Sequence, residues 1–144
     1  MSIRMKLVGK PGDIKDEHLS SLKELDRELF PNSPPNKFNE CYSFLAYDTD
    51  CVVGFCCLTP YPVNGTGFLS RVGVRKSYRG NGLQRKMIKI REKLAKKIGL
   101  SRLITYTSYD NIYSINNLIS CGYKFYKPKW EFGVKYAYYV QKFI

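Results

Sequence analysis

The sequence predicts an α/β protein whose mixed, mostly antiparallel sheet is flanked by helices, and three observations carry this prediction. Runs rich in β-branched and aromatic residues recur along the 144 residues. Apolar side chains at helical spacing follow turns at two places, after Asp13 and after Gly82. A strand, a helix and a strand follow one another within residues 66–108, the spacing of a crossover between two parallel strands. The expected element order is β-α-β-β-β-α-β-α-β-β, with about seven strands.

The composition favours one folded domain over residues 1–144. Hydrophobic residues make up 44% and aromatic residues 15% of the chain, which argues against disorder. A chain of this size buries roughly 70% of the surface that its unfolded form exposes. No apolar run approaches the ~20 residues of a membrane span, and the first residues do not resemble a secretory signal. We therefore expect a cytoplasmic protein, a monomer or a dimer, with no membrane partner.

Cysteine and histidine usage predicts reduced thiols and no metal site. The five cysteines are an odd number in apolar surroundings, and no two form a Cys-x-x-Cys pair. A single histidine, His18, makes a zinc site or a Ser-His-Asp triad improbable. The cysteines expected to be buried thiols are Cys41, Cys51, Cys56, Cys57 and Cys121.

The net charge of +12 is concentrated in the later part of the chain. Residues 1–50 carry seven Lys and Arg against nine Asp and Glu, which gives −2, and residues 51–144 carry seventeen against three, which gives +14. Such a surplus favours an anionic partner. Three alternatives remain open from charge alone: a solvated basic face, a nucleic-acid surface and a site for a polyphosphate cofactor.

The first third predicts a strand, a helix and a hairpin. Ile3–Val8 is strand-like, and Asp13 is a plausible N-cap for a helix that runs to about Phe30, where Pro31 forbids its continuation. A loop, with or without a short broken helix, should cover residues 31–39. Strands at 41–47 and 51–60 should form a hairpin, because a short polar turn joins them.

After the hairpin, the rest of the chain is predicted to alternate between strands and helices. Phe68–Val74 is a third antiparallel strand, and Gly73 within it suggests a bulge or a close approach by another group. A helix from Leu83 should end at Gly99. Its expected core stripe is Leu83, Met87, Ile90, Leu94 and Ile98, and its expected solvated face is Arg85, Lys86, Lys89, Arg91, Lys93, Lys96 and Lys97. The expected later elements are a strand at 102–108, a helix at 111–121 and strands at 123–126 and 134–143.

The junction at residues 79–84 places two glycines between a strand and a helix, so unpaired N–H groups and a positive helix end are available to a phosphate. A nucleoside-triphosphate loop is excluded, because no Gly-Lys-Ser/Thr follows. The dinucleotide fingerprint fits poorly, since the third glycine and the acidic residue about 20 positions on are missing. A tight turn with no ligand remains the structural alternative.

Nearly the whole chain resembles the GNAT superfamily of acyl-CoA-dependent N-acetyltransferases. The family carries Val-x-Val and then Arg/Gln-x-x-Gly-x-Gly/Ala opening a helix, and this chain has Val72-Gly73-Val74 followed by Arg79-Gly80-Asn81-Gly82-Leu83-Gln84. Gln84 departs from the pattern, because the family usually has Gly or Ala there. A second family motif, Asn-x-x-Ala/Ser with a later Gly-Phe, is matched by Asn111, Ser114, Gly122 and Tyr123.

The resemblance implies a single GNAT-like domain whose sheet is splayed between the strands around Val72 and Thr105. It implies N-acetyl transfer from acetyl-CoA, as co-substrate, to a primary amine by direct transfer in a ternary complex. The acceptor class, a protein N-terminus, a lysine or a small amine, is left open. The residues that the resemblance assigns to acetyl-CoA are Val72, Gly73, Val74, Arg79, Gly80, Asn81, Gly82, Leu83, Gln84, Arg85, Asn111 and Ser114, with Arg75 and Lys76 near enough in sequence to help.

At the positions where the family usually has its proton-transfer residues, this chain has different residues. Leu118 stands where relatives commonly have the tyrosine that protonates the CoA thiolate, so Ser114 and Cys121 on the same helical face become the candidates. The strand at 67–74 contains no carboxylate base. Glu28 is therefore the first candidate base, and a water chain is an alternative. Two further carboxylates remain as candidates, Glu40 and Asp110.

The acidic first helix could attract a protonated amine through Asp26 and Glu28. The alternative function is a catalytically weak or inactive GNAT-fold protein that binds CoA, nucleic acid or another protein. The missing tyrosine and carboxylate favour this alternative. The intact glycine loop and the Asn111 motif favour the enzyme, because an interaction module has no need of a pyrophosphate site. Nucleic acid is thus a possible but not a favoured partner.

Overall fold

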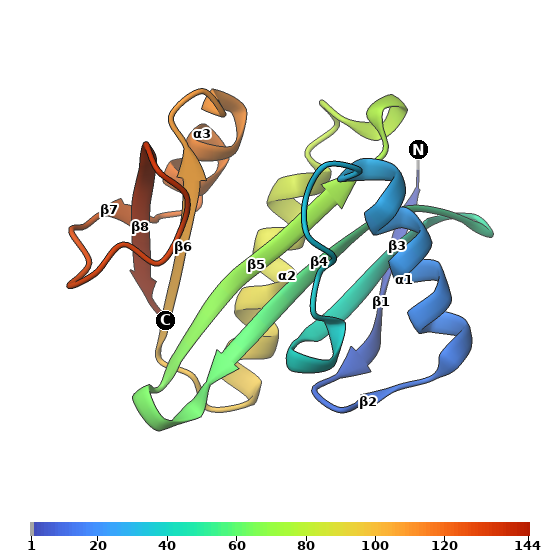
Figure 1. Cartoon of the computed structure of the whole chain (residues 1–144), viewed down its shortest axis with the longest axis horizontal. Helices are drawn as coiled ribbons and strands as arrows, with labels where there is room; N and C mark the ends of the chain where they lie inside the picture. Colours follow the sequence, from blue (N-terminus) through green and yellow to red (C-terminus); the bar gives the residue numbers. More distant parts are fainter. Residues whose placement is uncertain (1) are drawn as a thin grey trace. The chain divides into compact units, whose positions relative to one another are not determined.

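A computed structural model describes residues 2–144, which form eight strands and three α-helices (Figure 1). The α+β class with a mostly antiparallel sheet is therefore confirmed. The helices are α1 (Asp16–Leu29), α2 (Leu83–Lys97) and α3 (Ile112–Ser120). The strands are β1 (Ile3–Lys10), β2 (Asp13–Ile14), β3 (Tyr42–Asp48), β4 (Cys51–Tyr61), β5 (Thr66–Val74), β6 (Arg102–Ser108), β7 (Lys124–Phe125) and β8 (Ala137–Phe143).

The chain divides into two compact units that are interleaved in sequence. The first unit is Met1–Thr59 with Ser70–Leu83, and the second is Pro60–Leu69 with Gln84–Ile144. The strand β5 contributes its early residues to the second unit and its later residues to the first. Whether residues 1–144 act as one domain stays a prediction.

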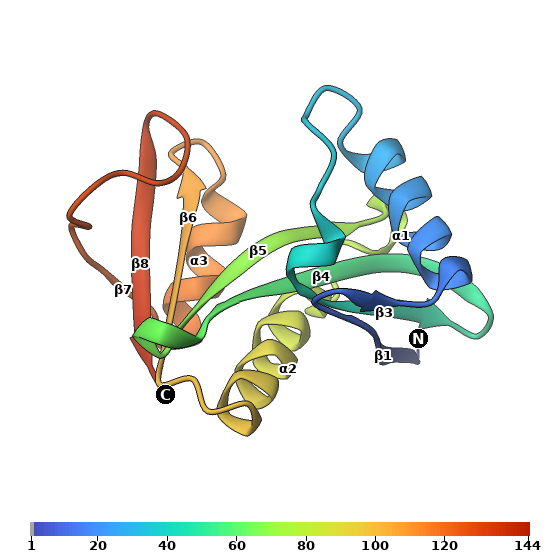
Figure 2. The ribbon, with the colours of Figure 1, turned by 60° about the horizontal axis from the view of Figure 1, so that its bottom comes forward.

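In the first unit, β2, β1, β3 and β4 follow one another in antiparallel order. Paired residues include Met5 with Ala46 and Phe44 with Cys56. Both views place α1 over these strands (Figures 1 and 2). Leucines three or four residues apart on α1 turn one face inward, as predicted. The core beneath α1 consists of Val8, Leu22, Leu25, Phe38, Cys41, Leu45, Phe55 and Cys57.

The prediction of Asp13 as a helix N-cap is wrong. Asp13 and Ile14 pair with Lys10 and Gly9 as the short strand β2, which is why eight strands are present rather than seven. Gly12, with a φ of 73°, supplies the left-handed residue of the turn between them. The helix α1 begins at Asp16, two residues later than an N-cap at Asp13 would place it, and its N-cap residue Lys15 makes no capping bond with its side chain.

The second unit contains the parallel pair that the crossover spacing predicted. Thr66, Gly67 and Phe68 of β5 pair with Arg102, Leu103 and Ile104 of β6. Just beyond these pairs, the Thr105 hydroxyl donates to the Leu69 carbonyl at 2.8 Å. The strands β8 and β7 complete this unit in antiparallel order, and α3 lies beside β6 (Figures 1 and 2). The predicted splay around Val72 and Thr105 involves both units and stays a prediction.

The last strand begins at Ala137 and not at Val134 as predicted. Tyr136 has a φ of 59°, which interrupts the extended backbone immediately before the strand. Upstream, Gly133 lies against the Tyr106 ring so closely that an added Cβ would be 2.5 Å from the ring atom Cγ. The segment before β8 is thus packed as an irregular loop, which alternation of apolar residues could not reveal.

The buried face of α2 matches the predicted stripe only in part, with Leu83 and Met87 buried as expected. Ile90, Leu94 and Ile98 are only partly buried, whereas Ile88 and Ala95 are fully buried. Arg91, which was expected on the solvated face, is 2% exposed. Its Nε donates to the Met87 carbonyl one turn earlier at 3.0 Å, so part of its polar head is satisfied on its own helix.

All five cysteines are free thiols, but their predicted burial is only partly correct. Cys41, Cys56 and Cys57 are buried, and Cys121 is half-buried. Cys51 is exposed, because it is the first residue after the turn that joins β3 to β4. Across residues 2–144, no helix combines the length and the apolar character that a membrane crossing requires.

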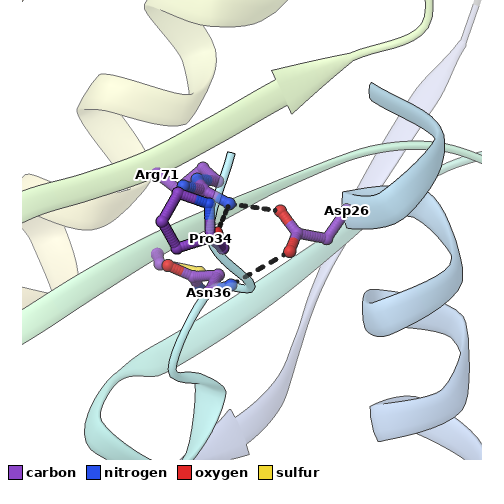
Figure 3. Close-up of polar contacts among 5 residues, drawn as sticks. Asp26, Pro34, Asn36 and Arg71 are labelled. Atoms are coloured by element: carbon purple, nitrogen blue, oxygen red, sulfur yellow. Dashed lines mark hydrogen bonds and ion pairs between the residues drawn. The ribbon is translucent and has the colours of Figure 1, made fainter. Parts of the chain in front are cut away.

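A buried ion pair fastens α1 to β5 within the first unit (Figure 3). The Asp26 carboxylate is 7% exposed, and one of its oxygens accepts from Arg71 Nη1 at 2.9 Å. The other oxygen accepts from the Asn36 N–H at 3.0 Å, and Arg71 also donates to the Pro34 carbonyl. The guanidinium lies 4.8 Å from the centre of the Phe30 ring. One charge pair therefore holds the helix, the following loop and the strand together.

We predict that Arg71→Ala lowers the free energy of unfolding by about 2–4 kcal/mol, because it leaves the buried Asp26 carboxylate without its counter-ion. Arg75→Ala is the matched control, since it breaks a second arginine pair from the same strand end to α1, with Glu28 at 3.3 Å. The side chains of that pair are 38% and 47% exposed, so water screens the pair and its loss should cost only about 0–1 kcal/mol. Urea unfolding of both variants measures the difference, and equal losses would contradict the prediction.

Candidate functional site

The glycine loop between β5 and α2 has the backbone that its two glycines predict. Gly80 and Gly82 have φ values of 81° and 76°, in the left-handed region that other residues rarely adopt. An added Cβ at either position would meet no heavy atom within 4 Å. The glycines are therefore needed for the conformation of the backbone, and the space beside their Cα atoms is open. The helix α2 begins at Leu83, directly after the loop, and the first N–H groups of a helix have no partners within it.

Three contacts in the first unit hold the segment that leads into the loop. The Arg75 N–H donates to the Val53 carbonyl at 2.9 Å, and Arg79 Nε donates to the Val74 carbonyl at 2.9 Å. The Tyr78 hydroxyl donates to the Asp48 carboxylate at 2.6 Å. This bond raises the pKa of Tyr78, because it requires the protonated phenol. The glycines thus follow an anchored turn and not a free loop.

Gly73, in the Val72-Gly73-Val74 segment, makes the close approach that the sequence suggested. An added Cβ would lie 2.8 Å from Leu29 Cδ1 and 3.0 Å from both Phe30 Cε2 and Phe55 Cε1. A side chain at this position would therefore force Leu29 or one of the two rings to shift. The accompanying bulge, and the free N–H groups of Val72 and Val74 that it implies, stay predictions.

The carboxylates that were candidates for the base or for attracting an amine differ in their surroundings. Asp26 is buried and paired with Arg71, so its predicted role in attracting a protonated amine is wrong. Glu28 is about half exposed and paired with Arg75, which also ties up one of the arginines expected to help bind phosphate. Glu40 and Asp110 are exposed, and Asp110 accepts from the Ser108 hydroxyl at 2.7 Å.

At the start of α3, Asn111 and Ser114 are joined as a helix cap. Asn111 is the N-cap residue, and its side-chain oxygen accepts from the Ser114 N–H at 3.2 Å. The part of the Asn111 motif that sequence analysis assigned to acetyl-CoA therefore also has a local structural role. The cap fixes Ser114 in the first turn of the helix.

Gln84 connects the first turn of α2 to α3 within the second unit. Gln84 Nε2 donates to Ser114 Oγ at 2.7 Å, and Gln84 Oε1 accepts from Asn117 Nδ2 at 3.1 Å. The side chain that departs from the family pattern is thus held by α3. Asn117 is 9% exposed and was not among the predicted residues. A polar residue three positions after Ser114, between the buried apolar residues Ile115 and Leu118, was the signal that could have found it.

Cys121 and Ser114 lie at opposite ends of α3. Cys121 is the C-cap residue, and its carbonyl accepts from Lys142 Nζ at 2.7 Å. Seven helical residues correspond to about 10 Å along the axis, so the two side chains cannot serve the same reacting atom. Leu118, between them, is a core residue at 6% exposure.

Tyr123, which takes the aromatic position of the second motif, belongs to the core. It is 1% exposed, and burial raises its pKa well above the usual value of a phenol. Because its side chain is enclosed in the core, Tyr123 is not a candidate to replace the tyrosine missing at Leu118. Among residues 2–144, no three His, Cys, Asp or Glu side chains are grouped so that they could hold a metal ion.

Comparison with known proteins identifies the family. Residues 13–123 match the acetyltransferase (GNAT) family, and this range includes residues of both units. Over 78 residues the chain is 35% identical to the probable N-acetyltransferase 14 of Xenopus tropicalis, a match that covers 54% of this chain. The chain spans only 38% of the length of that relative.

Solved structures share the fold. The PaiA N-acetyltransferase of Thermoplasma acidophilum, in complex with coenzyme A, has a TM-score of 0.72 at 14% identity, and all of both chains is covered. A GNAT family acetyltransferase of Elizabethkingia anophelis with acetyl-CoA bound has a TM-score of 0.72 at 14% identity, covering 99% of this chain and 98% of its own. The family match over most of the sequence, together with the glycine loop that opens α2, shows that this chain belongs to the acetyltransferase (GNAT) family.

Proposed function

We propose that this protein transfers the acetyl group of acetyl-CoA to a primary amine, by direct transfer in a ternary complex. The observation that carries the proposal is the glycine loop, where Gly80 and Gly82 leave open space at the positive end of α2. Membership of the family and the coenzyme A in the titles of two structures of the same fold support the donor.

In this proposal, the backbone N–H groups from Gly80 to Arg85 bind the pyrophosphate of the donor. A helix N-terminus stabilises a negative charge by about 0.3–2 kcal/mol, depending on its burial. Lys76 and Arg85 are exposed and can add charge, whereas Arg75 is engaged with Glu28. The Gln84 side chain does not obstruct this arrangement, because its amide is bonded to α3.

Two further parts of the site are assigned to the rest of the donor. The N–H groups of Val72 and Val74 would bind the thioester carbonyl and the pantetheine, and a donor aimed at the carbonyl oxygen would stabilise the charge that develops there. Asn111 and Ser114 lie at the start of α3, where another positive helix end is available.

The acetyl thioester supplies the activated acyl group, and the protein has to accommodate an uncharged amine and the proton that it loses. Glu28 is the candidate base, and its carboxylate is paired with Arg75 at 3.3 Å. A chain of water molecules is the alternative route for the proton. The acceptor is a protein N-terminus, a lysine or a small amine.

We predict that acetyl-CoA at about 100 times its Kd stabilises the protein by about 2.7 kcal/mol, seen as a rise in Tm. Gly82→Asp should abolish the rise, because it places a carboxylate where the phosphates bind. Gly99→Asp is the matched control, since Gly99 lies just beyond the other end of α2, also has a positive φ of 89° and also faces open space.

The control variant should keep the acetyl-CoA shift, although its own Tm falls as much as that of Gly82→Asp. If Gly82→Asp kept the rise in Tm with acetyl-CoA, the glycine loop would not be part of the donor site. The absence of any shift with the wild-type protein, together with salt-sensitive binding of nucleic acid, would favour the non-enzymatic alternative.

We also predict that no acetyl-enzyme forms. Incubation with acetyl-CoA alone should leave the intact mass of the protein unchanged, because direct transfer needs the amine before the thioester is cleaved. Cys121→Ala should keep kcat/KM within about threefold, since the loss of a group outside the reaction leaves the barrier nearly unchanged. CoA thiol release can be followed with three acceptors: a peptide with a free N-terminus, an N-blocked lysine peptide and spermidine. A mass increase of one acetyl group that Cys121→Ala removes would contradict direct transfer.

A further inference from the structure

We propose that a row of four aromatic side chains on the second unit binds single-stranded nucleic acid. The strands that carry the row are neighbours in the sheet, in the order β6, β8 and β7. The aromatic row consists of Phe125 on β7, Tyr138 on β8, Tyr109 directly after β6 and Tyr136 directly before β8. None of these residues is among those assigned to acetyl-CoA, so the inference goes beyond the proposed function and does not depend on it.

The rings of the aromatic row follow one another in contact. The ring centres of Phe125 and Tyr138 are 5.4 Å apart. The centres of Tyr138 and Tyr109 are 4.7 Å apart, and those of Tyr109 and Tyr136 are 6.2 Å apart. The backbone supports this order, because the Tyr109 N–H donates to the Tyr136 carbonyl at 2.9 Å. Neighbouring rings are inclined by 51° to 56°, so they do not cover one another by face-to-face stacking.

Most of the aromatic row is open to solvent. Tyr136 is 67%, Phe125 is 59% and Tyr109 is 49% exposed, and Tyr138 is partly buried. Phe125 and Tyr138 also line a hollow of about 450 Å³, together with Trp130, which is 72% exposed. Contiguous apolar surface on a folded protein marks an interaction site, because packing of the core does not require it.

The segment that carries the aromatic row is rich in lysine. Four lysines in it are exposed, and they are Lys124, Lys127, Lys129 and Lys135. The Lys135 ammonium lies 5.5 Å from the centre of the Tyr136 ring. Two carboxylates offset part of this charge, Glu131 in the same segment and Asp110 next to Tyr109. Because a positive excess remains, the partner that fits this surface is an anion with flat apolar groups.

Single-stranded nucleic acid combines these two features. Its phosphates are negatively charged, and its unpaired bases expose faces that stack on aromatic side chains. The spacing of the row gives successive bases separate rings to stack on. A duplex keeps the faces of its bases inside the helical stack, so it would use the lysines without the rings.

Other partners fit the aromatic row less well. A twofold contact with a second copy of this chain would bring the lysines of one copy against the same lysines of the other. An anionic membrane would attract the lysines, but insertion of the row would take three tyrosine hydroxyls out of water. An acidic peptide would satisfy the charge and leave the row of rings without a role.

The test is fluorescence anisotropy with labelled oligothymidylate and oligouridylate of about 15 nucleotides, within the range of site sizes for single-strand binding surfaces. Phe125→Ala and Tyr136→Ala should each raise the Kd about 5–100-fold, the loss expected for one stacked base. Phe143→Ala is the matched control, because Phe143 is a 71% exposed ring on β8 but lies about 16 Å along the strand from Tyr138. That control should keep the wild-type Kd.

Two further pairs of variants test shape and charge separately. Phe125→Tyr keeps a ring and should keep the Kd, whereas Phe125→Leu lacks a flat face and should lose as much affinity as Phe125→Ala. Lys135→Gln should reduce the slope of the logarithm of the association constant against that of the salt concentration by about 0.7, the contribution of one single-strand phosphate contact. Lys23→Gln on α1 is its control and should keep the slope.

Binding of either oligonucleotide with these effects supports the proposal, and the tighter one identifies the sugar that is preferred. Four results would overturn it: an unchanged Kd in both alanine variants, an equal loss in Phe143→Ala, wild-type affinity in Phe125→Leu, or a duplex of the same length bound as tightly as the single strand. Sedimentation with phosphatidylserine vesicles, or a dimer seen by light scattering, would also overturn it if Phe125→Ala abolished that association and left the oligonucleotide Kd unchanged.

The aromatic row and the donor site can fail independently. Phe125→Ala should keep the rise in Tm that acetyl-CoA causes in the wild-type protein, because this ring is not assigned to the donor. A wild-type protein whose Tm does not rise with acetyl-CoA would overturn the proposed function, and the oligonucleotide measurements would still decide the role of the row.

Discussion

The need to neutralise one buried carboxylate organises the first unit. Asp26 lies on α1, and its partners lie on the following loop and on β5, so α1 cannot move without exposing or unpairing a charge. The same strand then supplies Gly73, which packs against α1 because it has no side chain, and continues into the anchored turn before Gly80. The glycine loop therefore begins from a strand that is fixed on its α1 side.

The sequence predicted the parts of the structure that follow from local rules. Glycines with positive φ at 80, 82, 99 and 122 mark the ends of helices where they were expected. The parallel pairing of β5 with β6 followed from crossover spacing, which does not depend on knowing the core. The glycine loop was found because backbone conformation, helix start and charge all act within a few residues.

The errors concern partners that are distant in sequence. Asp26 and Arg91 look like surface charges on amphipathic helices, and only the fold shows that both are buried. Asp13 resembles a helix cap until Gly9 and Lys10 fold back on it as a strand. The bonds of Gln84 join residues 30 and 33 positions apart, so spacing within one element could not predict them. For the same reason the pairing of the candidate base Glu28 with Arg75, 47 positions away, could not be predicted from the sequence.

The hydrogen bond between Gln84 and Asn117 also constrains how this chain can evolve. Replacing Asn117 by an apolar residue leaves the Gln84 carbonyl oxygen without its donor, and replacing Gln84 by a small residue leaves the Asn117 amide nearly buried and unbonded. Each single change leaves one polar group without its hydrogen-bond partner and so lowers the stability of the fold, whereas the double change removes both polar groups. The two positions should therefore be inherited as a pair, polar together or apolar and small together, in the lineage that carries this protein.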